Sequence, residues 1–202
     1  MTTGRIEPGI NDVYLVGAVE RKPEFVYSEH GHKIYEGMLA VPRRSGEIDH
    51  VPIVGTDDMM DGLNVGRQVS VLGRIRHRDR HAYPLSVYRT VVYVEDVCFT
   101  PNLPPMNAVK LSGHICRPPY FRTTPRGRDL CELTMAVPRG NGPQDYVLCI
   151  AWNESAHVAR DMHVGRAVEV SGRFQSREYT KRLPDGSSET RMTHEVSLDS
   201  IE

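Results

Sequence analysis

The chain of 202 residues carries 25 Lys and Arg against 26 Asp and Glu, which gives a net charge of −1 at pH 7. A protein that binds nucleic acid through bulk charge would be strongly basic, so this class is excluded. No apolar run approaches the roughly 20 residues of a membrane-spanning helix. Met1–Asn11 shows no charged and then apolar leader, so we expect a cytoplasmic protein with no membrane partner.

The N-terminal part predicts a strand-rich unit with one short helix. Residues 1–10 are polar and contain Gly and Pro, which indicates a loose arm. Alternating apolar residues predict strands, and Thr56 followed by two acidic residues predicts the N-cap of a helix. The strands are expected at 13–19, 35–42, 50–54, 68–80 and 88–97, with the helix between the third and the fourth.

The fourth of these strands carries a row of arginines. Alternate residues from Val69 to Ile75 are apolar or Gly, which predicts one buried face. The pleat then places four guanidinium groups on the other face, those of Arg74, Arg76, Arg78 and Arg80. Such a row suits an anionic partner. The alternative is a solvated face, or one that forms salt bridges between two barrels.

A second unit follows a short linker, residues 100–106, that contains three prolines. A strand is expected at Tyr146–Trp152, and Asn153 is expected to cap a helix at Glu154–His163. An arginine strand then runs from Val164 to Tyr179. It leads into a long basic hairpin whose turn is Pro184-Asp185-Gly186.

The two units are copies of one another. Asn11, Val13, Leu15 and Gly17 recur 96 positions later as Asn107, Val109, Leu111 and Gly113, and Ala40-Val41-Pro42-Arg43 recurs as Ala136-Val137-Pro138-Arg139. The Val-Gly-Arg block recurs after 99 positions, so the second copy has an insertion before its fourth strand. Solenoid repeats have periods of roughly 20 to 50 residues, so this spacing indicates a duplicated domain, at 11–99 and 107–202.

The second copy resembles the bacterial single-stranded DNA-binding protein family. The resemblance lies in Asn-x-Val-x-Leu-x-Gly, Leu-x-Met-Ala-Val-Pro-Arg, Tyr-Val-Leu-Cys-Ile-Ala-Trp and Val-Gly-Arg-x-Val-x-Val-x-Gly-Arg-Phe-Gln-Ser-Arg-x-Tyr, followed by Thr-x-Glu-Val at 193–196. It covers 107–201 and, more weakly, 11–97. It implies an all-β protein of two tandem OB-folds, five-stranded barrels that each hold one short helix between strands three and four.

The resemblance also implies where single-stranded DNA would bind. Family members stack bases on aromatic rings at positions that match Tyr146, Trp152 and Tyr179, although the first two rings share their face with apolar residues and could instead form a subunit interface. Basic and polar residues nearby complete the predicted site in the second copy: Arg126, Arg128, Arg139, Arg173, Gln175, Arg177, Lys181 and Arg182. The first copy has His50, Thr56 and Arg80 at the aromatic positions, so we expect at most phosphate contacts from its arginine row.

We therefore expect a nucleoid-associated, non-catalytic protein that binds single-stranded DNA in replication, recombination or repair. Two chains of two barrels would supply the four barrels that usually act together in this family, which predicts a homodimer. The alternative is an accessory subunit that makes protein contacts in a primosome, plasmid or phage assembly. The sequence stops at Glu202 without the acidic tail of replicative members, so either the tail is missing from this sequence or the protein is an accessory member. We expect no cofactor and no metal, since the four Cys residues are widely spaced and the chain has no Gly-rich phosphate loop.

Overall fold

The computed structural model describes residues 8–78, 89–140, 142–183 and 185–202. Arg80, one of the predicted site residues, lies outside these ranges. No helix in the described ranges is long and apolar enough to cross a membrane.

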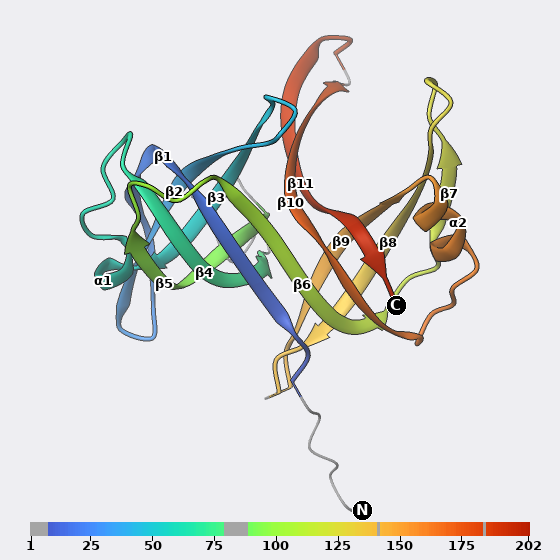
Figure 1. Ribbon diagram of the computed structural model, residues 1–202, viewed down its shortest axis with the longest axis horizontal. Helices are drawn as coiled ribbons and strands as arrows, with labels where there is room; N and C mark the ends of the chain where they lie inside the picture. The colour runs from blue at the N-terminus through green and yellow to red at the C-terminus, as the bar shows by residue number, and fades with distance from the viewer. Residues whose placement is uncertain (1–7, 79–88, 141, 184) are drawn as a thin grey trace, which may run out of the picture.

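The first half forms a closed five-stranded barrel (Figure 1). Its elements are β1 (Asn11–Glu29), β2 (His32–Pro42), β3 (Ile48–Thr56), α1 (Asp57–Met60), β4 (Gln68–His77) and β5 (Thr90–Phe99). Around the barrel, β1 pairs with β2, β2 with β3, β3 in parallel with β5, β5 with β4, and β4 again with β1.

The second half repeats this barrel. Its elements are β6 (Met106–Ile115), β7 (Tyr120–Thr123), β8 (Asp129–Pro138), β9 (Gln144–Trp152), α2 (Glu154–Arg160), β10 (Ala167–Arg182) and β11 (Ser188–Ile201). Strand β6 pairs with β8 and β10, β9 pairs with β8 and in parallel with β11, and β10 pairs with β11. The predicted all-β class with two tandem OB-folds is confirmed.

The two barrels are joined edge to edge through β1 and β6. These strands pair antiparallel, and Val13 lies opposite Val109, its own counterpart at the offset of 96. Asn11 then pairs with Leu111, and Leu15 pairs with Asn107, so the pairs are exchanged by a pseudo-twofold axis that passes between Val13 and Val109. The described strands thus form one eleven-stranded sheet. The pairing of β1 with β6, rather than the proline linker alone, sets the orientation of the two barrels relative to each other.

The buried sides of the strands follow the predicted alternation. Val69, Val71 and Ile75 of β4 are buried, as are Val168, Val170 and Phe174 of β10. All six belong to one continuous hydrophobic cluster that fills both barrels. Burial of these apolar side chains is the main driving force of the fold.

Two details differ from the sequence-based expectation. Strand β1 continues to Glu29, well past the expected end at Val19, because residues 18–29 pair with β2. The helices begin where expected, but α2 ends at Arg160 rather than His163. Neither Thr56 nor Asn153 makes a side-chain cap hydrogen bond. Asn153 instead has a positive φ of 51°, and its backbone N–H donates to the carbonyl of Asp129.

Candidate nucleic-acid interface

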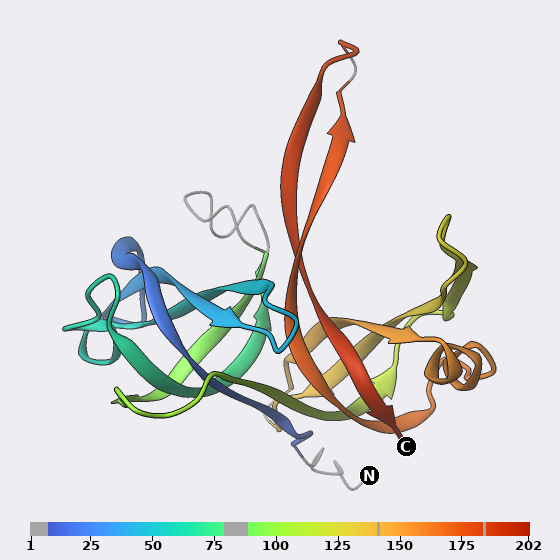
Figure 2. The ribbon, with the colours of Figure 1, turned by 45° about the horizontal axis from the view of Figure 1, so that its top comes forward.

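A long hairpin formed by β10 and β11 dominates the candidate site. Its strands pair without a break from Gly172↔Leu198 to Arg182↔Ser188. Figure 2 shows that its outer part stands well clear of both barrels. Every residue from Arg177 to Arg182 is exposed, because this part of the hairpin has no barrel interior on either side. Here the predicted site residues Tyr179, Lys181 and Arg182 are all accessible.

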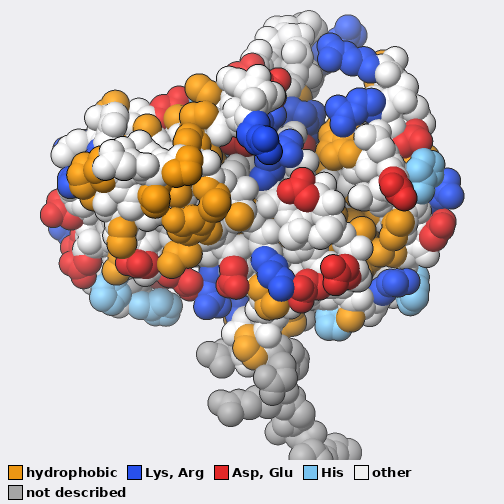
Figure 3. Space-filling view, in the orientation of Figure 1, with side chains coloured by type: hydrophobic (Ala, Val, Ile, Leu, Met, Phe, Trp, Pro, Cys, Tyr) orange, Lys and Arg blue, Asp and Glu red, His pale blue; other side chains and the backbone are white. Residues whose placement is uncertain are grey.

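One groove lies at the base of this hairpin, with a volume of about 800 Å³. We call it the tryptophan groove, since Trp152 lines it together with five predicted site residues: Arg126, Arg128, Arg173, Gln175 and Arg177. The guanidinium carbon of Arg128 lies 4.5 Å from the centre of the Trp152 ring, a cation–π contact. Figure 3 shows Lys and Arg side chains gathered around the hollow beside the hairpin.

A second groove, of about 990 Å³, also borders the hairpin. We call it the tyrosine groove, since Tyr146 and Tyr179 line it together with Lys181. Tyr146 is 51% exposed and Tyr179 38% exposed, so both rings can accept a stacking partner. The structure thus distributes the three predicted aromatic positions over two neighbouring grooves, with basic side chains in each.

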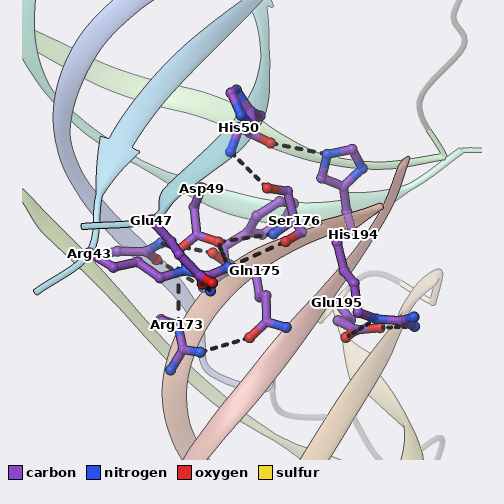
Figure 4. A network of polar contacts seen from close by, with 12 residues as sticks. Arg43, Glu47, Asp49, His50, Arg173, Gln175, Ser176, His194 and Glu195 are labelled. Atoms are coloured by element: carbon purple, nitrogen blue, oxygen red, sulfur yellow. Dashed lines mark hydrogen bonds and ion pairs between the residues drawn. The ribbon is translucent and has the colours of Figure 1, made fainter. Parts of the chain in front are cut away.

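A buried polar network fixes the base of the hairpin to the first half (Figure 4). Asp49 of β3 is fully buried, and its carboxylate accepts hydrogen bonds from both Nε and Nη2 of Arg43. The backbone N–H of Ser176 in β10 donates to Asp49 Oδ1 at 3.1 Å, and the Ser176 hydroxyl accepts the backbone N–H of His50 at 2.9 Å. Hydrogen bonds between buried groups of this kind hold a geometry firmly.

His194 of β11 adds a further contact between the halves. Its Nε2 lies 3.0 Å from the carbonyl oxygen of His50, and its ring lies 5.6 Å from that of Phe174. Burial lowers the pKa of His194 to about 4, because a charged imidazolium would lose its hydration. The ring is therefore neutral at pH 7, and its Nε2–H donates the hydrogen bond.

Two arginines of the second half that are predicted to contact DNA form hydrogen bonds within the protein. Arg139 donates through Nε, at 2.9 Å, and Nη2 to the buried carboxylate of Asp145, just as Arg43 does to Asp49 in the first half. Arg173 donates to Gln175 Oε1 at 2.7 Å and lies 4.0 Å from Asp49. A DNA contact from Arg139 stays a prediction, and its side chain is one-third exposed.

The arginine row of the first half is engaged in ion pairs. Arg74 contacts Glu95 at 2.5 Å, and Arg76 lies 3.7 Å from Asp145 of the other half. Arg78 lies on the same outer side as Arg76, but it is 5% exposed: its Nη1 lies 2.8 Å from Glu36, and its guanidinium carbon lies 5.4 Å from the centre of the Tyr27 ring. Its charge is paired with the buried carboxylate of Glu36, since an unpaired buried charge is costly. These contacts agree with the alternative of a salt-bridged face.

Sequence reasoning missed several residues that line the grooves. Arg43 and His50 of the first half border the tryptophan groove, and Arg89 and Arg117 border the tyrosine groove. Arg43 could have been found, because it is the counterpart of Arg139 in the repeated Ala-Val-Pro-Arg block. His50 stands at the position that corresponds to Tyr146, so its place beside a groove could also have been found. Arg89 and Arg117 carry no pattern in the sequence that predicts their position.

Comparisons with known proteins agree with this geometry. Residues 106–202 match the family described as single-strand binding protein family. The single-stranded DNA-binding protein of Thermus thermophilus is 27% identical over 215 aligned positions, which cover 91% of this chain and 81% of that protein. The second half therefore resembles the single-strand binding protein family, and the Thermus relative extends the similarity to both halves. The resemblance predicted from the motifs is thereby confirmed.

Further relatives match nearly the whole chain. The single-stranded DNA-binding protein of Deinococcus radiodurans is 24% identical over 91% of this chain and 73% of that protein. Among solved structures, the wild-type single-stranded DNA-binding protein from Thermus aquaticus superposes with a TM-score of 0.71 and 23% identity. That superposition covers 97% of this chain and 93% of the other, and it shows a shared two-barrel fold.

Proposed function

We propose that this protein binds single-stranded DNA without catalysis and with little sequence preference. The observation that carries the proposal is the hairpin of the second half, where two accessible tyrosines and Trp152 border grooves rich in arginine. Every base has a flat face, so one stacked base contributes about 1–3 kcal/mol whatever its identity. The similarity to the single-strand binding protein family supports the same function, since the Thermus and Deinococcus relatives are single-stranded DNA-binding proteins.

Local charge replaces bulk charge in this proposal. The chain is nearly neutral, yet four of the basic groups along the hairpin strands are within reach of a bound strand: Arg177, Lys181, Arg182 and Arg191. Contacts from such groups to phosphate release counterions, so affinity falls with salt. We propose a role in DNA replication, recombination or repair, where a protein of this kind protects exposed single strands.

We also propose that two chains associate, because the outer face of the sheet carries an exposed apolar surface. Leu72, Phe99, Leu103 and Met106 are each between 42% and 55% exposed. Tyr14 lies between Leu72 and Ala108 in the sheet and continues this surface. Figure 3 shows hydrophobic side chains gathered over this part of the first half, whereas the matching part of the second half carries the ion pair of Lys110 with Glu169. Exposed apolar area of this kind marks an interaction site.

Light scattering tests the association. A homodimer gives about twice the 22.8 kDa of one chain and supplies four barrels. A molar mass equal to that of one chain at all concentrations would contradict the homodimer. It would favour the second candidate function, an accessory subunit whose apolar surface contacts another protein. The introduction of a charge by Leu72→Glu should convert the dimer into monomers.

Fluorescence anisotropy of a labelled oligo-dT tests the function itself. We expect binding at low salt that weakens as salt is added, and no turnover or cleavage of the oligonucleotide. Equal affinity for a duplex of the same length would contradict the proposal, since a duplex does not offer base faces for stacking.

A further inference from the structure

The outer face of the first barrel is filled by its own side chains. Along β3, Val51 and Ile53 belong to the barrel core, so the alternation of a strand directs Val54 to the opposite side. There Val54 forms a separate buried cluster with Val26, Ile34 and Val91, and Tyr27 and Tyr93 pack against it. We call this group the outer cluster.

The same face is open in the second barrel. Glu36 and Glu132 are counterparts at the offset of 96, yet the side chain of Glu36 is 3% exposed and that of Glu132 is 34% exposed. Glu36 is closed in by the buried Arg78, at 2.8 Å. The position of Trp152, opposite Leu130, corresponds to Thr56, opposite Ile34.

The first strand of each barrel explains this difference. In the first half β1 runs unbroken to Glu29 and adds Val26 and Tyr27 to the outer cluster. In the second half Pro118 and Pro119 lie between β6 and β7, whereas the first half has a single proline there, Pro23, preceded by Lys22. Two successive residues of the second half therefore cannot donate a backbone hydrogen bond to a neighbouring strand. The strand is therefore interrupted there, and the face of β8 and β9 stays accessible.

Residues of the first half nevertheless line one side of both grooves of the second half. Glu47, Ile48 and His50, which lie at the start of β3, line the tryptophan groove. His77, Arg89 and Thr90, at the facing ends of β4 and β5, line the tyrosine groove. The contacts of Asp49 with Ser176 and of His50 with His194 hold these segments against the hairpin.

We propose that the two barrels form one composite single-strand site rather than two separate sites. This inference rests on the proposed function. The bound strand lies between the halves, its bases stack on the aromatic rings of the second barrel, and its phosphates pass the charged residues of the first barrel. The sealed face of the first barrel takes no part. The first half acts as a wall of the site, with Arg89 attracting the backbone and Glu47 repelling it.

Opposite charge reversals in the full chain test this proposal. Arg89 and Glu47 are both exposed, Glu47 with 70% of its side chain accessible. For Arg89→Glu we expect the Kd for labelled oligo-dT to rise roughly fivefold, and the plot of log K against log salt to become shallower by about 0.7. For Glu47→Lys we expect tighter binding and a steeper plot. The Glu47→Lys variant is informative because damage to the fold would weaken binding rather than tighten it.

Matched controls lie in the first half away from both grooves. Lys33→Glu and Glu24→Lys make the same charge changes at exposed residues of the β1–β2 hairpin, which lines neither groove. We expect the Kd of both controls to stay within twofold of the parent chain. If the parent chain binds and all four variants behave alike, the composite site is refuted and the proposed function stands. If the parent chain does not bind oligo-dT at all, both proposals fail.

Discussion

The side-chain amide of Asn107 in the second half lies 3.3 Å from the carboxylate of Asp49 in the first half. The same amide donates to the carbonyl of Phe174, and the Phe174 N–H donates back to its oxygen, both at 2.8 Å. The counterpart, Asn11, bonds Ile75 in the same way and lies 3.4 Å from Asp145. The repeated asparagine thus joins its own barrel to the buried acid of the other.

The two buried aspartates should differ in their importance for stability. Asp49→Asn leaves Arg43 with an uncharged partner and the Ser176 N–H with a weaker acceptor, so we expect the free energy of unfolding to fall by about 3 kcal/mol. Asp145→Asn should cause a smaller loss, because its contacts with Arg139 and Arg76 are nearer to solvent. Urea unfolding followed by circular dichroism measures both. Equal losses would contradict this ranking.

Protonation of His194 should lower the stability of the fold, because the ring is buried. Its folded pKa of about 4 lies below the ordinary value of 6.5, so the unfolded chain takes up a proton first as the pH falls. Stability is therefore complete above pH 6.5 and declines towards pH 4, by up to about 3 kcal/mol. The negative charge of Asp49 favours the protonated ring and so opposes this lowering of the pKa.

A substitution isolates this effect. In His194→Gln, the decline in unfolding free energy between pH 6.5 and pH 4 should become smaller. In the control His163→Gln, at an exposed position after α2, it should be unchanged. A decline of the same size in all three proteins would show that other groups cause it.

Gly172 should not tolerate a side chain. A methyl group at this position would lie 2.2 Å from the carbonyl oxygen of Ser197, and Gly73 is in the same situation, 2.3 Å from the carbonyl of Tyr93. Both neighbours are backbone atoms, so the strands would have to move apart. We expect Gly172→Ala to lower the free energy of unfolding by about 1–3 kcal/mol. Thr180→Ala, at an exposed position of the same strand, should have little effect.

How much of this could be predicted depended on whether the signal was local. The alternation around Val71 and Val170 and the repeated blocks predicted the strands and the duplication, because a barrel strand buries one face. Arg78 could not be placed this way. Its burial depends on Glu36, 42 positions earlier, and on a strand that continues beyond its expected end. The motifs of the second copy predict the exposed hairpin residues Tyr179 and Lys181 as site residues, but no local pattern indicates that the first barrel closes its own face.

The second half should dominate DNA binding. We expect Arg177→Ala with Tyr179→Ala to weaken affinity for oligo-dT more than tenfold, since one phosphate contact and one stacked base are lost together. Arg74→Ala with Arg76→Ala should weaken it much less, because neither side chain lines the tryptophan groove or the tyrosine groove. Anisotropy titrations at one salt concentration compare the two pairs. Equal losses would refute the asymmetry between the halves.

The emission of Trp152 gives the most direct test of the central claim that single-stranded DNA occupies the grooves beside the hairpin. It is the only tryptophan of the chain, and Arg128 covers its ring in the free protein. Titration with oligo-dT at low salt should quench this emission strongly, and added salt should weaken the effect, because stacking and phosphate contacts act together. Unchanged emission, with no change in the anisotropy of a labelled oligo-dT, would contradict the account and favour a protein-interaction role.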